Sequence, residues 1–198
     1  GNKIKEGYYL LHNPQERVLT VYQGSLTNNS SDVQSHSLEQ KRQELTAFML
    51  PRNLEYLADG DVVLVYPKTG NINVLYRKSS SSNSLFLTEQ CNNKCIMCCQ
   101  PPKRISDEYL YEAYLNAIPL MSDETVELGI TGGEPTLLKS KFTKIVSVCK
   151  HHLPNTSLHI LSNARMFNYL SFCQELSEVQ HPDLMIGVPL NSDIAGIH

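Results

Sequence analysis

Residues 125–135 read TVELGITGGEP, and this stretch decides the fold. Apolar residues alternate with others along it, which predicts a strand over Thr125–Thr131 that ends at Gly132-Gly133. Pro135 suits the first turn of a following helix, where a backbone N–H is not needed. Apolar residues then recur at helical spacing, namely Phe142, Ile145, Val146 and Cys149. The stretch therefore predicts one βα unit of an α/β fold.

Strands and helices alternate on both sides of this unit. Strands are predicted at Leu85–Thr88, Thr125–Thr131, Ser157–Ser162 and Leu184–Leu190. Ser106 is the expected N-cap of a helix between the first two strands. The helix between the last two strands is expected to bury Met166, Tyr169, Leu170 and Cys173. This alternation predicts about four βα units around a parallel sheet that curls toward a partial (β/α) barrel.

Residues 1–80 have a different pattern. They contain strand candidates at Tyr8–Leu11 and Arg17–Tyr22, a helical segment around Ser37–Leu50, and a hairpin pattern joining Asp61–Tyr66 to Ile72–Tyr76. The serine-rich run at 78–84 then predicts a linker. We expect a small α+β accessory domain over residues 1–80 and an α/β core over residues 84–198.

The composition of the 198 residues is that of an ordinary globular protein, with 41% hydrophobic and 19% charged residues. The net charge of −3 argues against a nucleic-acid partner. No apolar stretch approaches the roughly 20 residues of a membrane span, and no signal peptide is evident. We therefore expect a cytoplasmic protein that does not bind membranes. Because the chain begins with Gly1, we also expect it to be a piece of a longer product.

The six cysteines are distributed unevenly, which argues against a disulfide framework. Cys149 and Cys173 are isolated on predicted helix faces, where we expect small buried hydrophobic side chains. The others crowd into one segment, as Cys91, Cys95 and Cys98 with Cys99 next to them. In a reducing cytoplasm, such clustered thiols favour metal binding.

The C-x3-C-x2-C spacing of Cys91, Cys95 and Cys98 lets one loop present three thiolates to an iron–sulfur cluster. A fourth iron without a cysteine would then remain open to another ligand. Two alternatives stay open, which are a zinc site and unligated thiols. His151 and His152 are the candidates for a fourth zinc ligand, and Cys99 is expected to point away from the other three.

Gly132-Gly133-Glu134-Pro135 follows the second predicted strand, at the end where parallel α/β folds bind ligands. The glycines permit close approach of the backbone to a ligand. Glu134 supplies a carboxylate for a positively charged amino group. The alternative is a tight strand-to-helix turn with no ligand.

The three-cysteine loop and the Gly-Gly-Glu-Pro turn, in this order and one βα unit apart, resemble the radical S-adenosylmethionine (SAM) superfamily. The resemblance implies a [4Fe–4S] cluster held by Cys91, Cys95 and Cys98. It implies that the open iron binds the amino and carboxylate groups of SAM, and that the amino group also meets Gly132, Gly133 and Glu134. Reductive cleavage of SAM to a 5′-deoxyadenosyl radical is the chemistry this implies. No catalytic acid or base can be assigned.

Further cofactor contacts are implied by the same resemblance. The residue before the third cysteine often contacts adenine, and here it is Met97 rather than an aromatic residue. Polar residues that follow the third and fourth strands are implied to hold the ribose and methionyl carboxylate, namely Ser162 and Asn163, then Asn191, Ser192 and Asp193. The superfamily usually has a six-stranded partial barrel, so we expect this chain to be truncated before the last barrel strands.

A closer resemblance is to the HxsC maturase family of the His-Xaa-Ser peptide-modification system. It rests on four segments, Leu87–Asn93, Cys99–Pro102, Val188–Leu190 and Ser192-Asp193. It implies a peptide substrate, which residues 1–80 would help to recruit, and a ferredoxin- or flavodoxin-like electron donor. A radical enzyme that acts on a small molecule or nucleotide is the alternative. An iron–sulfur electron-transfer module or a zinc-binding module is the alternative of another class.

Overall fold

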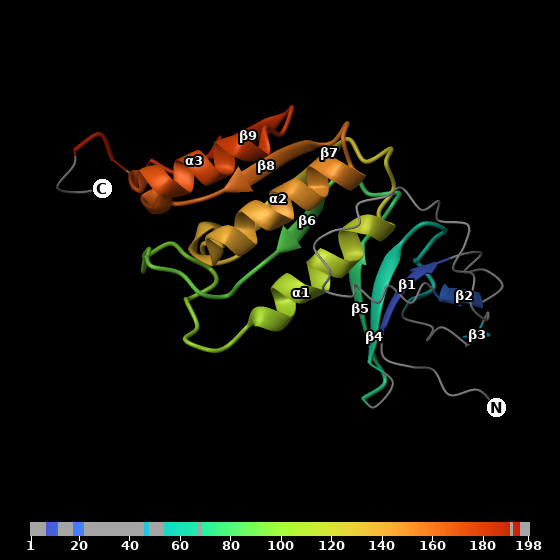
Figure 1. Ribbon diagram of the computed structural model, residues 1–198. Coiled ribbons are helices and arrows are strands. Elements are labelled where there is room, and N and C mark those ends of the chain that lie inside the picture. The colour runs from blue at the N-terminus through green and yellow to red at the C-terminus, as the bar shows by residue number, and fades with distance from the viewer. Residues whose placement is uncertain are drawn as a thin grey trace. The chain divides into compact units, whose positions relative to one another are not determined.

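The computed structural model describes residues 7–11, 18–21, 46–47, 54–66, 69–190 and 192–194. The chain divides into two compact units, Gly1–Ser80 and Ser81–His198 (Figure 1). Over the part of the chain that is described, no helix has both the length and the apolar character needed to span a membrane.

The first unit contains an antiparallel five-stranded sheet with the strand order β3-β2-β1-β4-β5. Its strands are β1 (Gly7–Leu11), β2 (Val18–Val21), β3 (Thr46–Ala47), β4 (Val62–Tyr66) and β5 (Asn71–Tyr76). The predicted hairpin is confirmed, since β4 pairs with β5 from Val62–Tyr76 to Tyr66–Asn71. The side chains of Val62 and Val63 are fully buried, so β4 supplies core to this unit.

The helix predicted around Ser37–Leu50 is wrong at Thr46 and Ala47, which form β3. Val18 pairs with Ala47 and Leu19 with Thr46, so a partner distant in the sequence fixes these residues as a strand. Local spacing of apolar residues carries no information about such a partner, and pairing overrides it. The rest of the predicted helix lies outside the described residues.

The second unit contains a parallel sheet with the strand order β6-β7-β8-β9. Its elements in chain order are β6 (Asn83–Phe86), α1 (Glu108–Ala117), η4 (Ile118–Leu120), β7 (Glu127–Thr131), η5 (Pro135–Leu138), α2 (Ser140–His152), β8 (Ser157–Leu161), η6 (Arg165–Asn168), α3 (Leu170–Val179) and β9 (Leu184–Gly187). The predicted α/β fold with a parallel sheet is confirmed, and it corresponds to part of a (β/α) barrel.

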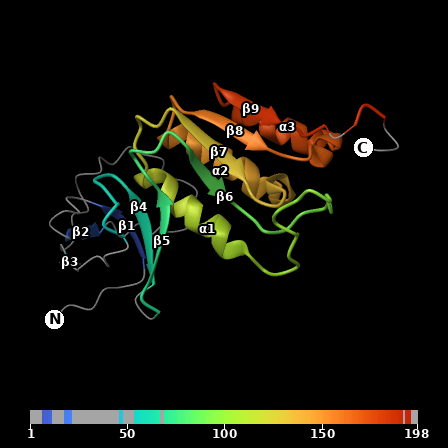
Figure 2. The same cartoon turned by 180° about the vertical axis from the view of Figure 1, so that it is seen from behind.

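Helices α2 and α3 pack on one face of this sheet (Figures 1 and 2). The strand side chains on that face are fully buried, namely Leu85, Leu128, Ile130, Leu158 and Ile160. They meet the predicted apolar face of α2, which consists of Phe142, Ile145, Val146 and Cys149 and is also fully buried. The alternate strand residues, such as Gly129 and His159, are only half-buried. One apolar face therefore holds each strand against the helices, and the other face is less buried.

Two details of the predicted helices differ from the structure. Asp107, not Ser106, occupies the N-cap of α1. Met166 is buried in η6, but Tyr169 and Leu170 are 58% and 72% exposed, so the predicted apolar face of α3 is wrong. Tyr169 has extended φ and ψ angles and separates η6 from α3. The helical period is interrupted there, and α3 buries Phe172 instead.

Candidate functional site

Three loops meet at the carboxyl edge of the parallel sheet, because all four strands point the same way. Residues 87–107 follow β6, Gly132–Glu134 follow β7, and Ser162–Ala164 follow β8. The structure thus brings the cysteine loop, the Gly-Gly-Glu turn and the polar pair Ser162-Asn163 to one edge. Parallel α/β folds place their ligand sites at this edge.

Asp107 ties down the start of the cysteine loop. Its carboxylate accepts hydrogen bonds from Thr88 Oγ1 (2.7 Å), the Glu89 N–H (2.6 Å) and Gln90 Nε2 (2.9 Å). Burial opposes ionisation of this carboxyl, but the three donors outweigh burial and hold its pKa below the ordinary value. Asp107 therefore occupies the N-cap of α1 without a side-chain hydrogen bond to the helix, because its carboxylate is used by Thr88, Glu89 and Gln90.

The end of the cysteine loop returns to Glu89 and Gln90, at the start of the loop. The Lys103 N–H donates to the Glu89 carbonyl (3.1 Å), and Lys103 Nζ forms an ion pair with Glu89 at 2.9 Å. Gln90 Nε2 also donates to the Ile105 carbonyl (3.1 Å). We call residues 88–90 and 103–107 the loop neck. The neck closes the loop at its base, while the segment that carries the thiols remains at the surface.

The Gly-Gly-Glu turn is hydrogen-bonded to the loop neck. The Gly133 N–H donates to the Thr88 carbonyl (2.7 Å), and the Glu134 N–H donates to the Gln90 carbonyl (2.8 Å). A Cβ atom on Gly132 would lie 2.4 Å from the Thr88 oxygen, and one on Gly133 would lie 2.3 Å from the Gln90 oxygen. Gly132 also has a φ of +141°, which L-amino acids rarely adopt. Both glycines therefore permit a close approach of backbone to backbone in this structure.

Glu134 is fully buried, and its carboxylate is held from within the protein. Oε1 accepts from the Thr136 N–H (3.1 Å), from Thr136 Oγ1 and from Ser162 Oγ (2.8 Å). Oε2 accepts from the Asn163 N–H (2.6 Å). The carboxylate expected to meet a ligand amino group thus joins the turn after β7 to the loop after β8.

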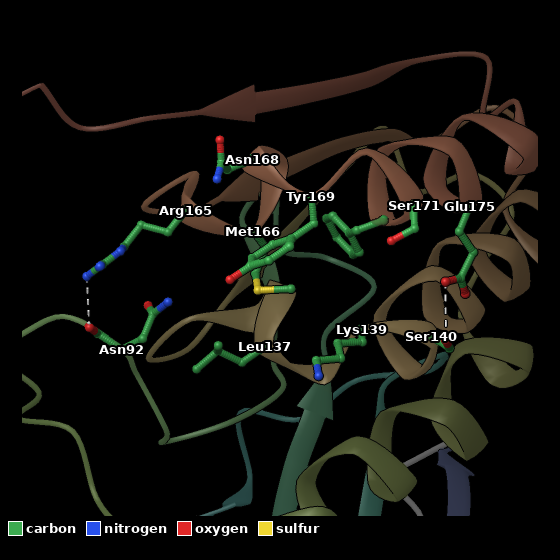
Figure 3. Close-up of a pocket in the computed structure, with 11 residues that line it drawn as sticks. Asn92, Leu137, Lys139, Ser140, Arg165, Met166, Asn168, Tyr169, Ser171 and Glu175 are labelled. Atoms are coloured by element: carbon green, nitrogen blue, oxygen red, sulfur yellow. Dashed lines mark hydrogen bonds between the residues drawn. The ribbon is translucent and has the colours of Figure 1, made fainter.

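The loop after β8 contacts the cysteine loop through two side chains. Asn163 Nδ2 donates to Asn92 Oδ1 (2.8 Å) and to Cys91 Sγ (3.8 Å). Arg165 Nη1 donates to the Asn92 carbonyl (3.2 Å) and to Asn93 Oδ1 (2.8 Å); Figure 3 shows the first of these bonds. Asn92 and Arg165 lie at one end of a cavity of about 860 Å³, whose far end is formed by Ser140 and Glu175.

All six cysteines are free thiols. Cys91 is half-buried, whereas Cys95 and Cys98 are exposed. Over the described residues, no three His, Cys, Asp or Glu side chains are gathered as a metal ion would require. The donor set nevertheless fits an iron–sulfur cluster in kind and number, since three free thiols lie on one loop that is anchored at its base.

The remaining cysteines and the paired histidines lie apart from the three thiols of the motif. Cys99 is exposed and borders a cavity of about 240 Å³ that Gly133 also lines. Cys149 is fully buried, as predicted, and burial raises the pKa of its thiol to about 12. Cys173 is half-buried, and its thiol donates to the Phe167 carbonyl at 3.2 Å. His151 and His152 end α2, which runs back to the amino edge of the sheet, opposite the cysteine loop.

The other residues predicted to contact the cofactor lie in different surroundings. Met97 is 64% exposed at the surface of the cysteine loop. Ser162 is buried against Glu134, and Asn163 is directed at the cysteine loop. Ser192 Oγ accepts from the Ile194 N–H at 3.0 Å, which forms a local turn after β9. Asn191 lies outside the described residues.

Asp107 and Arg165 are site residues that the sequence patterns did not reveal. Asp107 directly follows Ser106, the predicted N-cap, and this position gave no sign of a link to the cysteine loop. Arg165 follows the polar pair Ser162-Asn163 by two residues, and its position after a predicted strand was the one available signal.

A comparison with protein-family models agrees with this arrangement. The family model for the radical SAM superfamily matches residues 85–192, more than half of the chain. One solved structure to which the chain is similar is the selenomethionine crystal structure of BtrN in an open conformation. The sequence identity is 20% and the TM-score is 0.40. The match covers 57% of this chain and 52% of that structure, so the chain spans about half the length of the protein it matches. A comparison with curated protein sequences gives no match.

Proposed function

The chain belongs to the radical SAM superfamily, whose enzymes use a [4Fe–4S] cluster and S-adenosylmethionine, and we propose that Cys91, Cys95 and Cys98 hold that cluster. The observation that carries this proposal is the attachment of the cysteine loop to the Gly-Gly-Glu turn through Thr88 and Gln90. The attachment keeps three thiols on one loop next to the turn that the family uses for the cofactor.

The cluster and SAM together supply a 5′-deoxyadenosyl radical, which abstracts a hydrogen atom from a substrate. The residues of this chain bind and orient the two groups. We propose that the turn Gly132–Glu134 meets the methionyl amino group through its backbone, because the Glu134 carboxylate is buried and accepts four internal hydrogen bonds. Met97, Ser162, Asn163, Asn191 and Ser192 stay proposals as further cofactor contacts.

The ligand proposal is tested by anaerobic reconstitution with iron and sulfide. Cys95→Ala should lose most of the iron and the cluster absorbance, whereas Cys99→Ala should keep both. Retention of a full cluster in Cys95→Ala would refute the ligand assignment. Zinc in place of iron, in colourless protein, would favour the zinc-binding alternative.

The enzymatic proposal is tested by reductive incubation of the loaded protein with SAM. We expect 5′-deoxyadenosine and methionine in equal amounts. A change in the EPR spectrum of the reduced cluster on addition of SAM should accompany them. A cluster that does not respond to SAM would support an electron-transfer module instead.

We propose a peptide as the substrate, and Gly1–Ser80 as an accessory unit that helps to recruit it. Four short segments similar to the HxsC maturase family support this proposal, and the compact unit Gly1–Ser80, whose sheet has β5 as an edge strand, would suit peptide binding. A ferredoxin- or flavodoxin-like protein would supply the electron. A mass change on a His-Xaa-Ser repeat peptide tests the substrate; product formation only with a small molecule or nucleotide would favour the alternative.

A further inference from the structure

We propose that Asn163 is a positioning residue that holds Cys91 and sets the reduction potential of the cluster, with Arg165 anchoring the same loop. This inference rests on the proposed function, because it concerns the iron–sulfur cluster that Cys91 would help to hold. It gives Asn163 a role at the cysteine loop in addition to its proposed contact with SAM.

The orientation of the Asn163 amide follows from its hydrogen bonds. Its Oδ1 accepts from the Arg165 N–H at 3.1 Å, so this side of the amide must be the oxygen. The nitrogen therefore faces the cysteine loop, where it lies 2.8 Å from Asn92 Oδ1 and 3.8 Å from Cys91 Sγ. One NH2 group has two hydrogens, enough for both acceptors.

The backbone around Asn163 is held in place by the buried Glu134. The Asn163 N–H donates to Glu134 Oε2 (2.6 Å), and Ser162 Oγ donates to Oε1 (2.8 Å). The next residue, Ala164, has a φ of 61°, a conformation that residues other than glycine adopt only where the surroundings impose it. Ser162 Oγ accepts from the Ala164 N–H at 3.0 Å and stabilises this turn. The turn directs the side chains of Asn163 and Arg165 toward Asn92 in the cysteine loop.

Arg165 contacts two residues between the first and second cysteines. It donates to the Asn92 carbonyl (3.2 Å) and to Asn93 Oδ1 (2.8 Å). Cys91 Sγ itself accepts from the Asn93 N–H at 3.4 Å, so Arg165 fixes a residue that already contacts the sulfur. Asn163 and Arg165 together hold the segment that follows the first thiol.

A hydrogen bond to a cluster sulfur favours the more negatively charged, reduced state. It therefore raises the reduction potential, as hydrogen bonds to sulfur do in iron–sulfur proteins. Removal of the Asn163 NH2 group should make the potential more negative. Arg165 donates to Asn92 and Asn93 rather than to the sulfur, so its removal should loosen the loop and change mainly how long the cluster is retained.

The test compares Asn163→Asp with Asn168→Asp in cluster-loaded protein, using a redox titration followed by EPR. Both variants add one negative charge between β8 and α3, but Asn168 is exposed and, among the described residues, donates no hydrogen bond to the cysteine loop. We expect a more negative midpoint potential in Asn163→Asp than in Asn168→Asp, at equal iron content. Arg165→Gln should lose iron to a chelator several-fold faster than wild type.

A second measurement serves if Asn163→Asp does not load iron. In cluster-free protein, Asn163→Ala should raise the rate of Cys91 alkylation several-fold relative to Asn168→Ala. Equal potentials in the loaded variants, or equal alkylation rates in the cluster-free ones, would overturn the role of Asn163. Wild-type protein that binds no iron would instead refute the proposed function, and iron analysis separates the two outcomes.

Discussion

The amide nitrogen of Glu134 lies 2.8 Å from the carbonyl oxygen of Gln90, the residue that precedes the first cysteine of the loop. Two motifs that are separate in the sequence thus share a backbone hydrogen bond at the carboxyl edge of the sheet. The position of the cysteine loop depends on the turn after β7, and a change in that turn should reach the thiols.

Gly133→Ala tests this dependence. The new Cβ would lie 2.3 Å from the Gln90 oxygen, so the loop neck or the turn must move. We expect a loss of about 2–3 kcal/mol in the free energy of unfolding and a lower iron content after reconstitution. Urea unfolding and iron analysis measure the two effects.

Gly187→Ala is the matched control, because its Cβ would meet only side-chain atoms, at 3.1 Å from His159 Nε2 and 3.2 Å from Leu161 Cδ2. Flexible side chains move at a smaller cost than a backbone carbonyl. If Gly133→Ala retained wild-type stability and iron content, the close approach would not be a requirement of this site.

Asp107→Ala should destabilise the protein by about 1–3 kcal/mol, because three donors in the loop neck lose their acceptor. The effect should depend on pH. The pKa of Asp107 is lowered in the folded state, so its stabilising contribution is complete above the unfolded pKa of about 3.9. It is lost as pH falls through the lower folded value.

The difference in unfolding free energy between wild type and Asp107→Ala should therefore be constant near neutral pH and shrink below about pH 4. Denaturant unfolding over a pH series measures it. Asp123→Ala is the control, since Asp123 is exposed and outside the loop neck. A difference that grew on acidification would contradict the assignment.

The βα units were predictable because apolar residues recur at regular spacing along their strands and along α2, and those residues form the core. Leu128, Ile130 and Phe142 are fully buried as the period requires. β3 was not predictable, because Thr46 and Ala47 become a strand through pairing with Val18 and Leu19. The predicted face of α3 failed because the period was counted across a break at Tyr169.

The cysteine and glycine motifs were predictable from spacing, but the contacts that hold them were not. That Glu134 meets a ligand stays a prediction, but the hydrogen bonds that its carboxylate accepts from Thr136, Ser162 and Asn163 were not foreseen. The sequence alone does not distinguish a glutamate whose carboxylate is open to a ligand from one whose carboxylate is buried. The distinction depends on which loops meet at the sheet edge, and only the packing of β7 beside β8 determines that.

Native alkylation should separate the cysteines by environment. In cluster-free protein, the exposed Cys95, Cys98 and Cys99 should react readily, whereas Cys149 should not, because it is fully buried and its thiol pKa is about 12. In cluster-loaded protein, Cys95 and Cys98 should be protected while Cys99 still reacts. Peptide mass spectrometry distinguishes the sites. Protection of Cys99 on loading would make it a candidate ligand.

Glu134→Gln tests whether the buried carboxylate organises the two loops. The substitution keeps the shape but replaces one acceptor oxygen with an NH2 donor. That donor would face either the Asn163 N–H or the Thr136 and Ser162 groups, all of which already donate to Glu134. One donor must then lose its partner inside the protein, which costs about 1–3 kcal/mol for a neutral group and more beside a charge.

We therefore expect Glu134→Gln to lower the free energy of unfolding by about 2–4 kcal/mol. Ser162→Ala, which removes one of the four hydrogen bonds, should have a smaller effect. The two substitutions should also be non-additive in the double variant, because Ser162 and Glu134 are in direct contact. Urea unfolding of both single variants and the double variant measures this coupling. Strict additivity would show that the Ser162–Glu134 hydrogen bond does not couple the loop after β8 to the turn after β7.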